Sequence, residues 1–149
     1  MNPKLHTTLT MIFWFIVMVI LHFAFPIVEK LIVFPITFAG ITLVAVAIWL
    51  NVLSVKTLLD RDTPNLYATT PRHLVTVGPF SLSRNPIYVS TVALLLGVAI
   101  VFGSLSPFIG VLGWWLCLNF WFIPAEEKQL GQVFGVAFED YKRNVRRWL

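Results

Sequence analysis

The sequence predicts an all-α integral membrane protein with four transmembrane helices and a C-terminal amphipathic helix at the membrane interface. Three observations support this fold class. Charged residues make up only 12 % of the 149 residues, against about 25 % in soluble domains. Hydrophobic residues reach 58 %, with a mean hydropathy of +0.82, and a soluble domain of this length could not bury so much apolar surface. Uncharged apolar stretches of spanning length recur along the chain.

Four apolar stretches are expected to cross the membrane, because a helix needs about 17–25 apolar residues for one crossing. They cover about residues 9–25, 31–53, 87–102 and 105–123. A link of only a few residues, with Pro26 and Lys30 in it, separates the first two stretches. We therefore expect these two helices to form an antiparallel hairpin. In the turn before the fourth stretch, Ser106 can cap the helix and Pro107 suits its first turn.

Two polar segments complete a single membrane domain of residues 1–149. Residues 54–86 contain charged residues and four prolines, and a loop of this length is usually either functional or disordered. We expect it to be a cytoplasmic cofactor loop. In residues 124–149, apolar residues recur at steps of three and four between basic ones. This pattern is typical of an amphipathic helix on an anionic leaflet.

The distribution of basic residues predicts the orientation in the membrane. With four crossings, the amino end and both polar segments share one side and hold ten of the eleven Lys and Arg residues. Lys30 is the exception. Since basic segments stay in the cytoplasm, both termini are expected there, in a bacterial inner membrane rather than the endoplasmic reticulum.

Several classes of site and partner are not expected. The single cysteine, Cys117, excludes an internal disulfide and a cysteine-based metal site. The three histidines stand far apart and in no metal-binding spacing, so no metal is expected. The expected partners are the lipid bilayer and a lipophilic small molecule or lipid, with no nucleic acid. The oligomeric state stays open.

The densest group of binding residues lies between Pro71 and Tyr88, a turn-rich stretch with two arginines and a histidine. Glu126 and Glu127 follow the fourth apolar stretch. If the last two transmembrane helices form a hairpin, both features lie at its cytoplasmic mouth. Backbone N–H groups near Gly78 could hold a carboxylate, and a glutamate could hold an ammonium or a ribose hydroxyl. S-adenosylmethionine would fit this mixture.

The same residues also have a plain structural explanation. Asn85 could be the N-cap of the third helix, with Pro86 at its first position. Acidic residues such as Glu126 and Glu127 suit the start of a helix that follows Pro124. The residues alone leave both explanations open.

Four motifs occur in order along the second half of the chain. They are Leu74-Val75-Thr76-x-Gly78-Pro79-Phe80, then Arg84-Asn85-Pro86-x-Tyr88, then Glu126-Glu127-x-x-Leu130-x-x-x-Phe134-Gly135, and finally Tyr141 with Val145-x-Arg147. Together they resemble the isoprenylcysteine carboxyl methyltransferase family, which is related to the membrane phospholipid N-methyltransferases. The resemblance implies a cytosol-facing pocket for S-adenosylmethionine and a lateral opening to the bilayer for a lipophilic acceptor.

Carried over by position, the resemblance also implies cofactor contacts. They fall on Arg72, His73, Leu74, Val75, Gly78, Phe80, Asn85, Pro86, Ile87, Tyr88 and Glu126. Asn85 stands where the family has a histidine, and Phe80 where it often has a tyrosine. Phe122 replaces an arginine that serves the substrate in the eukaryotic enzymes, which weakens the case for a prenylcysteine carboxylate as acceptor. Arg84 or Arg72 could supply the missing cation.

The expected chemistry is direct methyl transfer, in which the protein supplies proximity, alignment and a water-poor site. No catalytic residue is assigned. Glu127 and His73 are the candidates for deprotonating an amine, and Arg84 is a candidate for binding the substrate. Whether oxygen, nitrogen or sulfur is methylated stays open. The alternatives are a phospholipid N-methyltransferase, a nicotinamide-dependent membrane reductase and a non-catalytic membrane protein.

Overall fold

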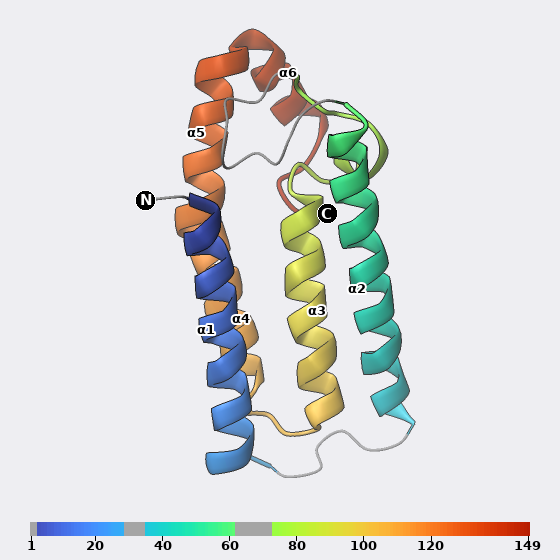
Figure 1. Cartoon of the computed structure of the whole chain (residues 1–149), viewed down its shortest axis with the longest axis vertical. Coiled ribbons are helices and arrows are strands. Elements are labelled where there is room, and N and C mark those ends of the chain that lie inside the picture. The colour runs from blue at the N-terminus through green and yellow to red at the C-terminus, as the bar shows by residue number, and fades with distance from the viewer. Residues whose placement is uncertain (1–2, 29–34, 62–72) are drawn as a thin grey trace.

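The computed structural model describes residues 3–28, 35–61 and 73–149, and within these ranges the secondary structure is helical (Figure 1). The α-helices are α1 Pro3–Ala24, α2 Ile36–Leu59, α3 Pro86–Phe102, α4 Phe108–Cys117, α5 Ile123–Phe134 and α6 Val136–Asn144. A short 3₁₀ helix, η1 Gly78–Ser81, precedes α3. A π turn, η2 Leu118–Phe122, joins α4 to α5.

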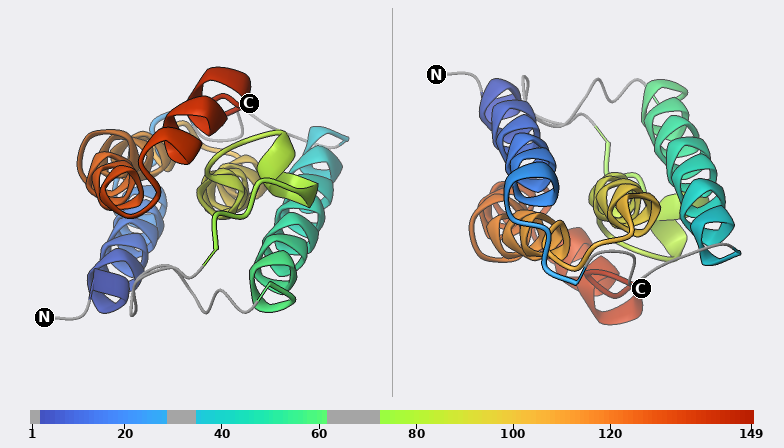
Figure 2. Two further views of the ribbon diagram at one scale, coloured as in Figure 1. Left: turned by 90° about the horizontal axis from the view of Figure 1, so that it is seen from above. Right: turned by 90° about the horizontal axis from the view of Figure 1, so that it is seen from below.

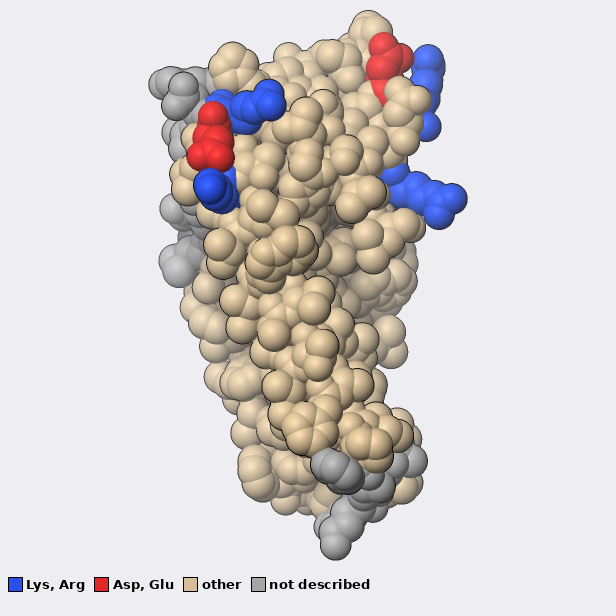
Figure 3. Space-filling model, turned by 90° about the vertical axis from the view of Figure 1, so that its right-hand side faces the viewer, with Lys and Arg blue, Asp and Glu red and all other residues tan. Residues whose placement is uncertain are grey.

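Among the described residues, three helical segments are long and apolar enough to cross a membrane, as expected for an integral multi-pass membrane protein. They are His6–Ala24, Ile36–Leu59 and Phe108–Phe134, the last of which runs through α4, η2 and α5. The 17-residue α3 is also apolar but shorter. Large hydrophobic side chains such as Phe13 and Trp49 are exposed on the outer faces of α1 and α2. On the face in Figure 3, charged side chains gather at one end, above an apolar flank.

The packing order of the helices differs from their order in the chain. α2 packs along α3, α1 packs along α4, and α3 also contacts α4. Figure 2 shows α1 beside α4 and α2 beside α3, so that α1 and α2 stand at the two ends of the α3–α4 pair. The predicted hairpin of the first two helices is therefore wrong in its packing, although the two helices do run antiparallel (Figure 1).

Two glycines allow α2 and α3 to approach closely. A Cβ atom built on Gly97 would lie 2.7 Å from a methyl of Val44 and 2.8 Å from the carbonyl oxygen of Gly40. Close approach of backbones at small residues is a common way to pack helices in membranes. This contact holds the second half of α3 against the first half of α2.

The predicted single helix over residues 124–149 is wrong at both ends. Pro124 does not begin a new helix, because α5 continues α4 through η2. A proline inside a helix removes one N–H group and crowds the preceding turn, and the wider π turn just before Pro124 accommodates both effects. Gly135, at φ 51°, then ends α5. α6 ends at Asn144, and Val145 is extended.

The turn between α3 and α4 also differs in detail from the expectation. Ser106 does not cap α4, because Pro107 occupies the cap position. The Ser106 hydroxyl instead donates to the carbonyl oxygen of Leu21 at 3.1 Å. The turn is thereby attached to the end of α1. We call this end of the bundle the neutral end, formed by residues 20–28 and 102–107.

Candidate functional site

The loop before α3 is attached to α2 through apolar side chains. Gly78, with φ +61°, starts η1 in a conformation that glycine adopts easily. Val75 and Phe80 are buried and form a small core with Leu58 of α2, against which Ile87 packs. Their side chains therefore have a packing role in the structure.

The residues just before α3 bind the chain that follows α6. The backbone N–H of Arg84 donates to the carbonyl oxygen of Arg146 at 2.9 Å. The Asn85 amide donates to the carbonyl oxygen of Arg147 at 2.9 Å, and Ser83 Oγ donates to the same oxygen at 3.2 Å. Asn85 occupies the N-cap position of α3 but makes no side-chain cap. Its predicted capping role is wrong, because its amide binds the tail.

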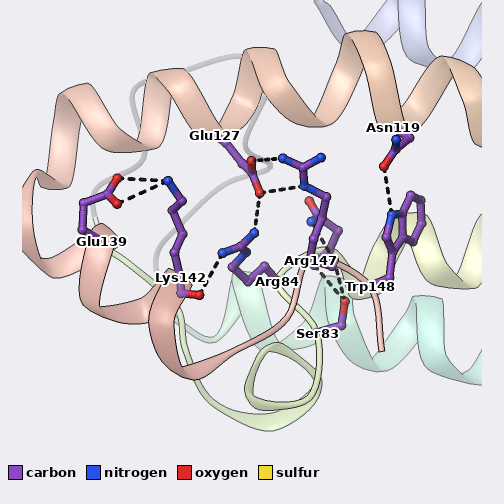
Figure 4. A network of polar contacts seen from close by, with 9 residues as sticks. Ser83, Arg84, Asn119, Glu127, Glu139, Lys142, Arg147 and Trp148 are labelled. Carbon is purple, nitrogen blue, oxygen red and sulfur yellow. Dashed lines mark hydrogen bonds and ion pairs between the residues drawn. The ribbon is translucent and has the colours of Figure 1, made fainter.

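Glu127 is held between two arginines (Figure 4). Arg84 Nη2 donates to one of its carboxylate oxygens at 2.8 Å, and Arg147 donates to both, at 2.6 and 3.2 Å. Arg84 and Glu127 are nearly buried, with side chains 10 % and 13 % exposed. Arg84 also donates to the carbonyl oxygen of Lys142. Glu127 therefore clamps α5, the loop and the tail together.

Glu126 has a different partner, although it is the next residue in the chain. Tyr88 donates its hydroxyl proton to Oε1 of Glu126 at 2.5 Å. Consecutive residues of a helix point about 100° apart, so α5 presents one glutamate to the arginine clamp and the other to the first turn of α3. The two motifs are thus in direct contact.

The other predicted residues lie around this contact. Pro86 is buried at the first position of α3, as predicted. His73 is exposed, and Leu74 is half-buried at the beginning of the loop. Arg72 lies outside the described residues.

Tyr141 joins α6 to the loop. Its hydroxyl donates to the carbonyl oxygen of Phe80 at 2.6 Å. Burial raises the pKa of Tyr141 from 10.0 to about 12, against the opposing effect of the positive charge of Arg84. The bond therefore persists at neutral pH.

Sequence reasoning missed the clamp function of the tail. The basic residues of the tail suggested a membrane surface, whereas Arg147 is directed at Glu127. Trp148 also points inward, and its indole N–H donates to Asn119 at 3.1 Å. The motif Val145-x-Arg147 contained the information, but it could not identify the partner of the arginine.

Comparison with known proteins agrees with these motifs. The family model described as phospholipid methyltransferase matches residues 35–137. This family belongs to the same group of small membrane methyltransferases as the isoprenylcysteine enzymes. A protein of Haemophilus influenzae described as uncharacterized is 35 % identical over 63 residues, which are 42 % of this chain and all of the relative. No solved structure matches. The chain belongs to the phospholipid methyltransferase family.

Proposed function

We propose that the protein transfers a methyl group from S-adenosylmethionine to a lipophilic acceptor in the membrane. Family membership supports this reaction class. The observation that carries the proposal is the hydrogen bond between Tyr88 and Glu126. It joins two motifs 38 residues apart in the sequence, where α5 meets the first turn of α3.

We also propose four crossings, with both termini in the cytoplasm. α3 has 17 residues and a length of about 25 Å. It begins at the end where α2 finishes and ends where α4 begins (Figure 1). If α2 and α4–α5 cross the membrane, α3 has to cross the same layer. The charged side chains at one end support a cytoplasmic orientation of that end.

The polar groups of the site fit a molecule that carries an ammonium, a carboxylate and a ribose. Oε2 of Glu126 accepts no hydrogen bond from a described residue, so it is available to an ammonium or a hydroxyl. The buried Nε of Arg84 lacks a partner within the described ranges. It could donate to a carboxylate. We propose Glu126 and Tyr88 as the central cofactor residues.

The other proposed contacts are those that the family resemblance implies. Val75 and Phe80 use their side chains for packing and Asn85 uses its amide for the tail. Cofactor contacts at these three positions would come mainly from backbone atoms. The remaining proposed contacts are Arg72, His73, Leu74, Gly78, Pro86 and Ile87.

S-adenosylmethionine supplies a methyl group that its sulfonium already activates. The protein then has to align donor and acceptor and exclude water. A carboxylate or thiolate acceptor needs no base. For an amine, Glu127 is a poor choice, because contact with a substrate would break its ion pairs with Arg84 and Arg147. His73 is then the remaining candidate base, and Arg84 is better assigned to the clamp.

Calorimetry on the purified protein in mild detergent tests this function. S-adenosylmethionine and, separately, NADPH are titrated into the wild type, Glu126→Gln and the control Glu139→Gln, which changes an exposed carboxylate on α6. We expect saturable S-adenosylmethionine binding that only Glu126→Gln weakens, about tenfold or more. NADPH binding alone would favour the reductase. Folded protein that binds neither would overturn the proposal.

A further inference from the structure

A cleft lies between α1 and α2, with α3 at its base. Its volume is about 300 Å³, at the small end of the range for ligand pockets. Met11 of α1 and Ile48 and Val52 of α2 line its apolar part. An apolar chain from the surrounding bilayer would fit such a lining.

The cleft also contains one amide, that of Asn51. Ser90 donates its only hydroxyl proton to the carbonyl oxygen of Ile87 at 2.6 Å. Ser90 Oγ must therefore accept from Asn51, whose Nδ2 lies at 2.8 Å. This directionality fixes the orientation of the Asn51 amide: its nitrogen faces Ser90, and its oxygen faces the other way.

The amide oxygen of Asn51 is the acceptor that stays available in this lining. It receives no hydrogen bond from a described residue. The neighbouring Thr91 is already engaged, because its hydroxyl donates to the carbonyl oxygen of Tyr88 and accepts from the indole of Trp114. An unsatisfied carbonyl in a membrane costs several kcal/mol. A ligand with an O–H or N–H group would satisfy it.

We propose that this cleft binds the acceptor, with its apolar chain between α1 and α2 and its O–H or N–H group on Oδ1 of Asn51. That this ligand is the methyl acceptor rests on the proposed function. The bond from Thr91 to Tyr88 connects the cleft to the Tyr88–Glu126 contact about one helical turn away. Asn51 thereby selects amphiphiles with a hydrogen-bond donor over those without one.

A matched pair of probes tests this selectivity without any cofactor. 1-Hexadecanol has a hydroxyl donor, and its methyl ether lacks it. Thermal unfolding of the detergent-solubilised protein is followed by tryptophan fluorescence at equal mole fractions of each probe in the micelle. We expect the alcohol to bind the wild type about threefold to tenfold more tightly than the ether. A wild type that does not distinguish the probes would overturn the inference.

Two variants and a control locate the effect. Asn51→Leu should remove the preference for the alcohol, whereas Thr42→Val, on the lipid-exposed side of the same helix, should keep it. A preference that survives in Asn51→Leu would overturn the assignment. If Asn51→Leu does not fold, Met11→Trp decides, since a ring in the cleft should abolish the effect of both probes. If the alcohol stabilised Met11→Trp as much as the wild type, the assignment of the cleft would also be overturned.

This test and the cofactor test can fail separately. S-adenosylmethionine binding without discrimination between the probes would overturn the cleft assignment and leave methyl transfer in place. Discrimination between the probes without S-adenosylmethionine binding would support the cleft as a lipid site and overturn the methyltransferase proposal.

Discussion

The two ends of the bundle hold distant parts of the chain together by different chemistry. At the neutral end, His22 Nδ1 and Ser104 Oγ lie 2.8 Å apart, and the N–H of Leu105 donates to the carbonyl oxygen of Ile27. At the other end, which we call the charged end, Arg84, Glu127 and Arg147 form an ion-pair cluster in which Arg84 and Glu127 are nearly buried (Figure 4).

Within the described residues, the neutral end is held by hydrogen bonds without an ion pair, whereas the nearly buried ions of the charged end carry a large desolvation cost. The clamp holds α5 so that Glu126 meets Tyr88. The charged end thus combines a structural cluster with a carboxylate that has an available oxygen.

Breaking the clamp should have the largest effect. Glu127→Gln leaves Arg84 nearly buried without a counter-charge, and we expect it to lower the free energy of unfolding by about 3 kcal/mol. Unfolding by SDS in mixed micelles measures this loss. The control Glu139→Gln removes an exposed ion pair with Lys142 and should cost less than about 0.5 kcal/mol. Equal losses in both variants would contradict the clamp.

Breaking the neutral end should have a smaller effect. Ser104→Ala removes the bond to His22, and we expect it to cost about 1 kcal/mol in the same unfolding assay. S-adenosylmethionine affinity should not change, because Ser104 lies at the opposite end of the bundle from Glu126. A loss of affinity in this variant would show that the two ends are coupled.

A third effect, confined to alkaline pH, concerns Tyr141. The pKa of Tyr141 is about 12 in the folded chain and 10.0 ordinarily. Between these values the folded chain keeps a proton that the unfolded chain has lost, so the free energy of unfolding falls as pH rises. The contribution is complete below pH 10 and lost above about 12. Tyr141→Phe should show a shallower decline between pH 10 and 12, and an identical slope would contradict this assignment.

The sequence predicted the general architecture of this chain better than it predicted which helices and side chains contact one another. Long apolar stretches and the convergence of Tyr88 with Glu126 follow from composition and from the resemblance. The π turn before Pro124 does not, because a proline after an apolar stretch is usually a helix boundary. The break at Gly135 was hidden by an apolar periodicity that continues across it. Hydrogen bonds to backbone carbonyls, such as that from Asn85 to Arg147, depend on tertiary structure that residue types do not encode.

The π turn η2 also determines the direction in which the two glutamates point. Such a turn holds one residue more than the α-helical path, and one residue corresponds to about 100° of rotation. α4 keeps its packing against α1 and α3 whatever follows it, whereas the phase of α5 depends on the extra residue being taken up within the π turn. If the same residues wound as a regular α-helix, α5 would be rotated by about 100°, and Ala125 would stand roughly where Glu126 now meets Tyr88. Deleting the exposed Phe120 would instead let the turn return to the α-helical path and leave both glutamates facing their present partners. The direction of each acid is therefore set by the hydrogen bonding of a turn several residues upstream.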